Sequence, residues 1–285
     1  MRLIALGAVA ALGSSLTGCG GPGTSPVGPS PIASTTAHVP SPRPSAPAAE
    51  VSRPPTLPPA PGGLIPVFDR GAGHGEKVVA LTFDADMTAA EGRRAAAGEH
   101  FDNPALIALL RRSKVPATVF MTGRWAEEYP AQARSIGADP LFEVANHSYS
   151  HYAFTSPCYG LPALPEGGMR KDVARAFAAF RAAGVRNVVP YFRFPGGCYD
   201  DASRRALAPE KVTAVQWDVV SGDAFATDAD AVARQVLDGV KPGSLVVMHC
   251  TRSAAPVTEK ALRTVVPRLR ERGYRFVKVS DLMRG

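Results

Sequence analysis

The sequence predicts an α/β fold in which parallel strands close, or nearly close, into a barrel. Seven short apolar runs recur within residues 64–285, and segments with helical patterns lie between them. A strand followed by a helix, repeated about seven times without an internal sequence repeat, is typical of a parallel sheet covered by helices. In such a barrel the functional residues follow the carboxyl ends of the strands.

The predicted strands are residues 78–83, 117–121, 141–145, 189–194, 213–217, 244–249 and 275–279. A helix over residues 104–112 is indicated by Asn103 before it and a proline at its first position. A second helix over residues 169–183 ends at a glycine. A third covers residues 257–273 and contains Pro267, which should kink or split it.

The first 18 residues are predicted to be a lipoprotein signal peptide. One positive charge, Arg2, precedes an apolar run that is too short and wrongly flanked for a spanning helix. The run ends in Leu16-Thr17-Gly18-Cys19, which resembles a bacterial lipobox and implies a lipid on Cys19. We therefore expect an extracytoplasmic protein anchored to the outer face of the bacterial cell membrane. The alternative is an ordinary signal peptide or a short buried helix.

Residues 19–63 are dominated by Pro, Ser, Ala and Gly and are predicted to be a disordered tether. The alternative is a proline-rich ligand for a partner domain. Residues 64–285 are long enough for one sizeable core and are predicted to be a single folded domain.

The chain carries a net charge of +7, with its basic residues scattered among acidic ones and no aromatic ladder between them. This pattern argues against a nucleic-acid partner and favours an anionic envelope polymer. We expect a monomer without an organic cofactor.

Ionisable residues follow the ends of several predicted strands, and in a barrel they would meet at one mouth. They are Asp84 and Asp86, His147 and His151, Arg193, Asp223, and His249. The two histidines are four residues apart, which on a helical turn places both rings on one face, as in zinc sites. A carboxylate would complete a set that leaves coordination positions open. Read alone, the histidines are equally a capping or core pair, and Asp84 a turn former.

Arg193 interrupts an apolar run, and a buried guanidinium needs an anion, for which Asp84 is the natural candidate. Asp223 either shapes its loop or holds the ring of His249 by accepting a proton from it. Taken alone, a histidine at the end of a buried strand, such as His249, is more often structural.

Five segments resemble, in order, the motifs of the NodB-like polysaccharide deacetylases, carbohydrate esterase family four. They are residues 82–84, 147–151, 193–196, 217–223 and 245–249. The resemblance covers about residues 78–279, so it makes residues 64–285 the catalytic domain. It implies a distorted (β/α) barrel of about seven parallel strands, in agreement with the alternation of strands and helices.

The resemblance also implies metal-dependent hydrolysis of N-acetyl groups from an N-acetylated polysaccharide such as peptidoglycan or a chitin-like oligosaccharide. The ion would be zinc, with cobalt or another divalent ion as the alternative. A backbone N–H near Gly196 would hold the oxyanion. The matching residues are Asp84 as base, His147 and His151 as metal ligands, Arg193 as the residue that steadies the base, Asp223 as partner of the acid, and His249 as acid.

The chain departs from the family pattern after the first strand. The family has two adjacent aspartates followed by Gly-Pro, whereas Asp84 is followed by Ala85 and then Asp86. Asp86 could take the metal, which we favour; the histidines could hold it with water; or metal binding has failed and a glycan-binding relic remains. Ala224 also replaces a frequent aromatic residue, which leaves a different wall around His249.

Cys158, Cys198 and Cys250 remain after Cys19 is assigned to lipid. They allow one disulfide and one spare thiol in three ways, and a bridge between two motif loops is expected. The predicted function is N-deacetylation of a cell-wall or related polysaccharide. The alternatives are hydrolysis of O-acetyl esters on a polysaccharide and a non-catalytic, glycan-binding lipoprotein.

Overall fold

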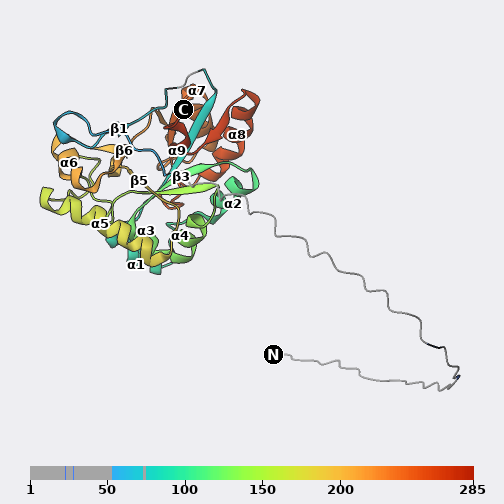
Figure 1. The fold of residues 1–285 in the computed structure, drawn as a ribbon, viewed down its shortest axis with the longest axis horizontal. Helices are drawn as coiled ribbons and strands as arrows, with labels where there is room; N and C mark the ends of the chain where they lie inside the picture. Colours follow the sequence, from blue (N-terminus) through green and yellow to red (C-terminus); the bar gives the residue numbers. More distant parts are fainter. Residues whose placement is uncertain (1–22, 24–27, 29–52, 73–74) are drawn as a thin grey trace, which may run out of the picture. The chain divides into compact units, whose positions relative to one another are not determined.

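The structure is a computed structural model that describes residues 23, 28, 53–72 and 75–285 (Figure 1). The predicted signal peptide, Cys19 and most of the predicted tether lie outside these residues. The described residues 53–72 and 75–285 belong to one compact unit. The domain boundary at residues 63/64 stays a prediction. Among the described residues, none of the helices combines the length and the apolar character that crossing a membrane requires.

Within the described part of the chain, a parallel sheet of nine strands forms the centre of the fold. The seven predicted strands are β2 (Val78–Ala85), β3 (Ala117–Met121), β4 (Phe142–Asn146), β5 (Val188–Phe192), β6 (Thr213–Val215), β8 (Ser244–His249) and β9 (Arg275–Val277). Two short strands, β1 (Val67–Phe68) and β7 (Val219–Val220), were not predicted.

The strand order is β1-β6-β5-β4-β3-β2-β8-β7, and β9 pairs with β2 beside β3. Within the described residues β1 and β7 form the two ends of this order and do not pair with each other. The sheet is therefore a curled half-barrel, which confirms the predicted distorted (β/α) barrel.

Among the residues that the structure describes, helices connect most successive strands, though not β1 to β2 or β6 to β7, and cover the outside of the sheet (Figure 1). The α-helices are α1 (Gly92–Ala96), α2 (Pro104–Arg112), α3 (Gly123–Glu128), α4 (Pro130–Gly137), α5 (Glu166–Ala183), α6 (Asp201–Ala206), α7 (Ala229–Gly239), α8 (Thr258–Glu271) and α9 (Val279–Leu282). Short 3-10 turns are η1 (Pro61–Gly63), η2 (Ala89–Glu91), η3 (Pro195–Gly197) and η4 (Ala208–Glu210). Figure 1 shows α3, α4 and α5 grouped together and α7 beside α8.

The predicted helix ends follow from local chemistry. The side chain of Asn103 accepts a hydrogen bond from the N–H of Leu106 and so caps α2, as expected. Gly184 ends α5 in the left-handed conformation that glycine adopts without strain. Pro267 was expected to kink or split the third helix; a split is wrong, because α8 continues through the proline. Burial of the apolar residues on either side of the proline offsets the hydrogen bond it removes.

Alternation along β2 sorts its side chains onto two faces. Val79, Leu81, Phe83 and Ala85 pack in the core that contains α2 and α8, on the helix-covered side of the sheet. Ala80 belongs instead to the inner cluster on the concave side. Even-numbered residues of β2, including position 84, therefore face the inside of the half-barrel.

Candidate active site

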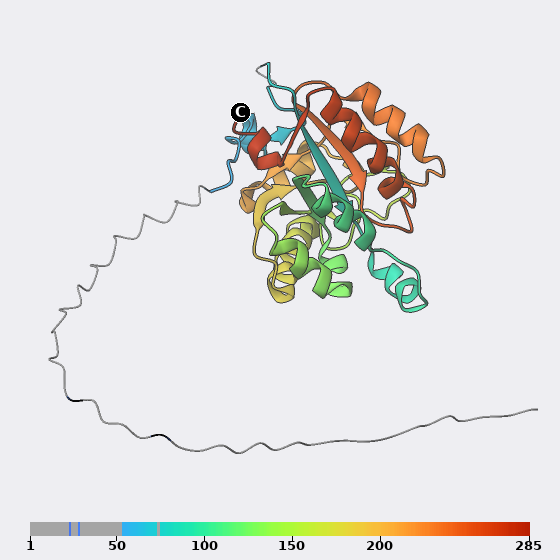
Figure 2. The ribbon, with the colours of Figure 1, turned by 90° about the vertical axis from the view of Figure 1, so that its right-hand side faces the viewer.

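The carboxyl ends of β2 and β8 bring the predicted base and acid together. The two strands run side by side, β2 in teal and β8 in orange in Figure 2, and Asp84 is paired in register with His249. Cross-strand partners in a parallel sheet present their side chains on the same face. The local sheet register therefore makes these two side chains neighbours although 165 residues separate them in the chain.

The predicted ion pair between Arg193 and Asp84 is present. Nη1 of Arg193 donates to Oδ1 of Asp84 over 2.6 Å, and both side chains are buried. The remaining guanidinium nitrogens, Nε and Nη2, donate to the carbonyl oxygens of Val215 and Gln216 over 3.2 and 3.3 Å. The guanidinium also lies over the ring of Phe120, with Cζ 3.9 Å from the ring centroid. This arrangement fixes Arg193 completely and leaves Oδ2 of Asp84 available.

The charges around Asp84 keep it ionised. Burial by itself would raise the pKa of this carboxyl, but the charge and hydrogen bond of Arg193, with the charge of His249 adding to them, outweigh burial and lower the pKa below its ordinary value. Asp84 is therefore a carboxylate at neutral pH, the form that can accept a proton.

Asp223 holds His249 with a complete set of hydrogen bonds. Oδ1 of Asp223 lies 2.8 Å from Nδ1 of His249 and accepts the hydroxyl of Ser221 over 2.9 Å. Oδ2 accepts the backbone N–H of His249 and the hydroxyl of Thr258, both over 2.7 Å. Both the position and the ring orientation of His249 are thereby set, as predicted for Asp223.

The same contacts keep His249 protonated. Burial would lower the pKa of the ring, but the hydrogen bond and charge of Asp223, with Asp86 and Asp84 adding to them, raise it to about 10. The pKa of Asp223 is lowered in turn, because His249 outweighs the effect of burial on the carboxyl. The imidazole is 24 % exposed, so its Nε2 side can be reached from solvent.

His147 and His151 follow β4 in a loop, and the prediction of a helical turn is wrong. Asn146 accepts the N–H of Ser148 over 2.8 Å, and Ser148 accepts the N–H of His151 on its hydroxyl over 2.9 Å. Ser148 and His151 both have left-handed backbone, with φ of 69° and 56°. The loop nevertheless brings the two rings together, with centroids 5.0 Å apart.

The two histidines and two aspartates of the site turn ring nitrogens and carboxylate oxygens toward one another. Nδ1 of His147 lies 2.9 Å from the carbonyl oxygen of Arg193, which only accepts, so the ring proton is on Nδ1. Burial lowers the pKa of His147 to about 4, so its Nε2 carries a lone pair at neutral pH. That atom faces Oδ2 of Asp84 over 3.6 Å, and Nε2 of His151 faces Oδ2 of Asp86 over 3.9 Å.

This donor chemistry suits a divalent cation. Nitrogen and oxygen ligands of one tetrahedral zinc ion lie roughly 3.3–3.6 Å apart. The one pair made of two predicted ligands, His151 with Asp86, nearly reaches this spacing at 3.9 Å, whereas the pair at 3.6 Å includes the predicted base, Asp84. Among the described residues no group of three or more His, Cys, Asp or Glu side chains is arranged to hold a metal ion as it stands. The assignment of Asp86, His147 and His151 as ligands therefore stays a prediction.

Three hydroxyl groups at this site were missed by sequence reasoning. Ser221 and Thr258 bind Asp223, and Thr251 binds Asp86 with its hydroxyl 2.5 Å from Oδ1. Isolated hydroxyl residues carry no motif of their own. Two signals were available: Ser221 lies inside the motif segment 217–223, and Thr251 lies two residues after a motif histidine, the spacing that returns a side chain to the same face of a strand.

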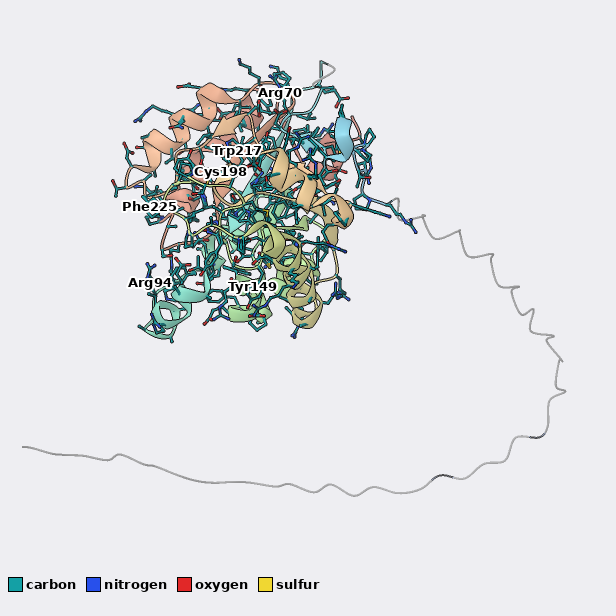
Figure 3. The ribbon with its side chains drawn as sticks, turned by 90° about the vertical axis from the view of Figure 1, so that its left-hand side faces the viewer. Arg70, Arg94, Tyr149, Cys198, Trp217 and Phe225 are labelled. Carbon is teal, nitrogen blue, oxygen red and sulfur yellow. A yellow bond between two sulfur atoms is a disulfide. The ribbon has the colours of Figure 1, made fainter. Side chains whose placement is uncertain are left out.

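A disulfide joins the loops that follow the second and third motifs. It links Cys158 to Cys198, whereas Cys250 is a buried free thiol. The predicted disulfide between two motif loops is therefore present, and its two cysteines are now identified. Figure 3 labels Cys198 and Trp217. A Cβ on Gly197, the residue before Cys198, would lie 2.5 Å from the Trp217 ring, so only glycine fits there.

Comparison with known proteins supports one family. The polysaccharide deacetylase family model matches residues 71–215, just over half of the chain. The chain is 29 % identical to a chitooligosaccharide deacetylase of Sinorhizobium fredii, over 60 % of this chain and 80 % of the relative. It is 26 % identical to a peptidoglycan-N-acetylglucosamine deacetylase of Bacillus cereus, over 74 % and 90 % of the two chains.

A solved structure with the same fold belongs to a family member described as a pseudoenzyme. The chain resembles a carbohydrate esterase family 4 pseudoenzyme of Bacillus anthracis, with a TM-score of 0.62, 26 % identity, and coverage of 79 % of this chain and 69 % of that one. A mutant of that protein, equally similar in fold, has restored enzymatic activity. The family match and the shared fold together show that this chain belongs to the polysaccharide deacetylases, the NodB-like family 4 of carbohydrate esterases.

Proposed function

We propose that this chain is a metal-dependent hydrolase that removes N-acetyl groups from a cell-wall or related N-acetylated polysaccharide. The observation that carries this proposal is the register pairing of Asp84 with His249, which sets an ionised carboxylate beside a protonated imidazole. Hydrolysis of an amide needs both groups, because a base must deprotonate the attacking water and an acid must protonate the leaving amine.

Asp84 is the base of the proposed reaction. Its Oδ1 is held by Arg193 over 2.6 Å, so Oδ2 takes the proton of water as the oxygen attacks the acetyl carbon. Four contacts fix the guanidinium of Arg193, and Arg193 in turn holds the carboxylate of Asp84 in one orientation. A base that is already oriented does not have to be ordered before the proton transfer. We propose that a backbone N–H near Gly196 donates to the oxyanion. The N–H of Gly197 does not serve, because it already donates to the carbonyl of Phe194.

His249 is the acid of the proposed reaction. Its Nδ1–H is committed to Asp223, so its Nε2–H is the proton that reaches the sugar nitrogen as the C–N bond breaks. The products are acetate and a free amine on the sugar. Asp223 stabilises the imidazolium and prevents the ring from turning, which is the positioning role of a carboxylate behind a catalytic histidine.

Asp86, His147 and His151 would hold a divalent ion, which we propose to be zinc, with cobalt or another divalent ion as the alternative. When bound, such an ion polarises the acetyl carbonyl and acidifies the attacking water. The fit rests on the donor set, because neutral imidazole nitrogens and carboxylates are the ligands that zinc prefers.

The substrate and the location are proposed together. Relatives named as chitooligosaccharide and peptidoglycan-N-acetylglucosamine deacetylases support an N-acetylated glycan as substrate. A lipid on Cys19 would hold the enzyme at the outer face of the membrane, and the Pro-rich residues 19–63 would let it reach the wall. We propose that it acts there as a monomer.

The test is acetate release by the purified full-length chain, stripped of metal and then resupplied with zinc or cobalt. N-acetylglucosamine oligomers, peptidoglycan and an O-acetylated polysaccharide are compared in parallel, and glycan binding is measured on the same samples. The proposal predicts metal-restored release from the N-acetylated glycans. Release from the O-acetylated polymer alone would favour the esterase alternative, and binding without any release would favour a non-catalytic lipoprotein.

A further inference from the structure

Thr251 lies where β2 and β8 separate, next to the carboxylate that departs from the family pattern. The register of the two strands ends at Asp84 with His249, and one more backbone bond follows, from the N–H of Cys250 to the carbonyl of Asp84 over 2.9 Å. At Asp86 a side chain takes the place of the backbone acceptor: the hydroxyl of Thr251 accepts the N–H of Asp86 over 3.2 Å. The same hydroxyl lies 2.5 Å from Oδ1 of Asp86 and donates to it. One side chain therefore fixes both the backbone and the carboxylate of Asp86.

The neighbouring position 85 is committed to the opposite face of the sheet. Ala85 is fully buried in the helix-side core, and its carbonyl accepts the N–H of Thr122 over 3.0 Å. Thr122 also accepts the N–H of Met87 on its hydroxyl over 3.1 Å, which fixes the chain on the far side of Asp86. A carboxylate at position 85 would point away from the histidines, whereas one at position 86 points toward them.

The hydrogen bond from Thr251 decides which oxygen of Asp86 faces the histidines. Oδ1 is occupied by the hydroxyl, and Oδ2 is the atom that lies 3.9 Å from Nε2 of His151. The side chains of Asp86 and His151 are each only 16 % exposed, so bulk water does not compete strongly for the carboxylate and its orientation is kept. Outer partners of this kind orient metal ligands and limit the rotamers they can adopt.

We propose that Thr251 is a positioning residue that lets Asp86 serve in place of the carboxylate missing at Ala85. The inference rests on the proposed function, because it concerns the divalent ion of that same site. A hydroxyl that only stabilised the loop would contribute equally to folding with or without metal. A positioning hydroxyl makes a specific difference to metal affinity, and serine can replace it.

The experiment measures the apparent affinity of the full-length chain for zinc by competition with a chromophoric chelator, together with the melting temperature without metal. Thr251→Val and Thr251→Ala remove the hydroxyl with and without filling its space, so one remains informative if the other fails to fold. We expect zinc affinity to fall by about 10- to 100-fold in both, as is usual for lost outer partners, and to return toward the wild-type value in Thr251→Ser. The matched control is Thr155→Val, which removes an equivalent threonine-to-aspartate hydrogen bond, to Asp200, outside the site.

Three results would overturn different parts of the account. Unchanged zinc affinity in Thr251→Val and Thr251→Ala, with weakened affinity in Asp86→Asn, would refute the role of Thr251 and leave the proposed function standing. Unchanged affinity in Asp86→Asn would refute Asp86 as the ligand that Thr251 positions. No zinc binding by the unaltered chain would refute the metal-dependent function itself.

Discussion

Two regions at the mouth of the half-barrel differ in how their polar atoms are hydrogen-bonded. The acid pair, Asp223 and His249, uses both carboxylate oxygens twice in hydrogen bonds within the protein. The donor group is Asp86, His147 and His151. The hydroxyl of Thr251 holds Asp86 and the carbonyl of Arg193 holds His147, while Oδ2 of Asp86 and the Nε2 atoms of the two histidines face the inside of the site.

This difference separates two properties that can be changed independently. A fully bonded acid pair defines a protonation state, so changes there should alter the rate and its pH dependence without altering metal affinity. The donor group defines a charge and a geometry, so changes there should alter metal affinity first. Asp84 lies between the two regions, because it is paired with His249 across the sheet and faces His147 with its Oδ2.

The largest expected effect comes from removing the acid. His249→Gln should lower kcat for acetate release by about 10²–10⁴, the usual contribution of a positioned proton donor. Zinc affinity should stay near the wild-type value, because the donor group keeps its own partners. Steady-state kinetics at saturating zinc measure kcat, and chelator competition measures zinc affinity. A fall in zinc affinity in parallel with kcat would contradict the claim that the two regions control separate properties.

Ala85→Asp tests the claim that position 85 faces the core. A carboxylate there would be buried without a partner, so the free energy of unfolding should fall by about 3 kcal/mol or more. Urea denaturation measures the change, and Ala224→Asp, on an exposed loop beside the acid pair, is the matched control with an expected effect below about 0.5 kcal/mol. A stable Ala85→Asp chain with tighter zinc binding would show that the loop can adopt the family arrangement.

Removing the disulfide should affect the donor group more than the acid pair. Cys158 and Cys198 follow the loops of His151 and Arg193, and their bridge closes a sequence separation of 40 residues. The double change to serine should lower the free energy of unfolding by about 2–4 kcal/mol and weaken zinc binding. The pH dependence of the rate should be unaffected, so a shifted pH profile would contradict the separation.

The pH profile should report the acid pair directly. A rate that needs protonated His249 is maintained below the pKa of that ring and lost as pH rises through it, so the basic limb should lie near pH 10. Asp223→Asn removes the main cause of the raised pKa, and the limb should move down toward the ordinary histidine value of 6.5. An unmoved limb would mean that another group is the acid.

The sequence predicted much of this fold because strand patterns and strand ends are local. Two strands, β3 and β8, have the predicted bounds, and the ion pair of Arg193 with Asp84 followed from the cost of an unpaired buried guanidinium. From the residues alone Asp223 could either shape its loop or hold the ring of His249; the family resemblance implied the contact with His249, which is present.

The parts that could not be predicted depend on tertiary contacts. The disulfide partners were open because all three cysteines follow motif loops, and only the arrangement of the loops brings Cys158 to Cys198. The spacing of His147 and His151 indicated a helical turn, but Asn146 and the hydroxyl of Ser148 shape a different bend. The hydrogen bond from Thr251 to Asp86 spans 165 residues, and the spacing of Thr251 two residues after His249 does not identify its partner.

The most direct test of the account compares Asp84→Asn with Asp86→Asn in acetate release and zinc affinity, measured on the full-length chain with N-acetylglucosamine oligomers. We predict that Asp84→Asn loses turnover while it still binds zinc, and that Asp86→Asn loses zinc affinity and regains part of its turnover at high zinc. Full turnover of Asp86→Asn at the zinc concentration that saturates the unaltered chain would contradict the assignment of these two carboxylates as base and metal ligand.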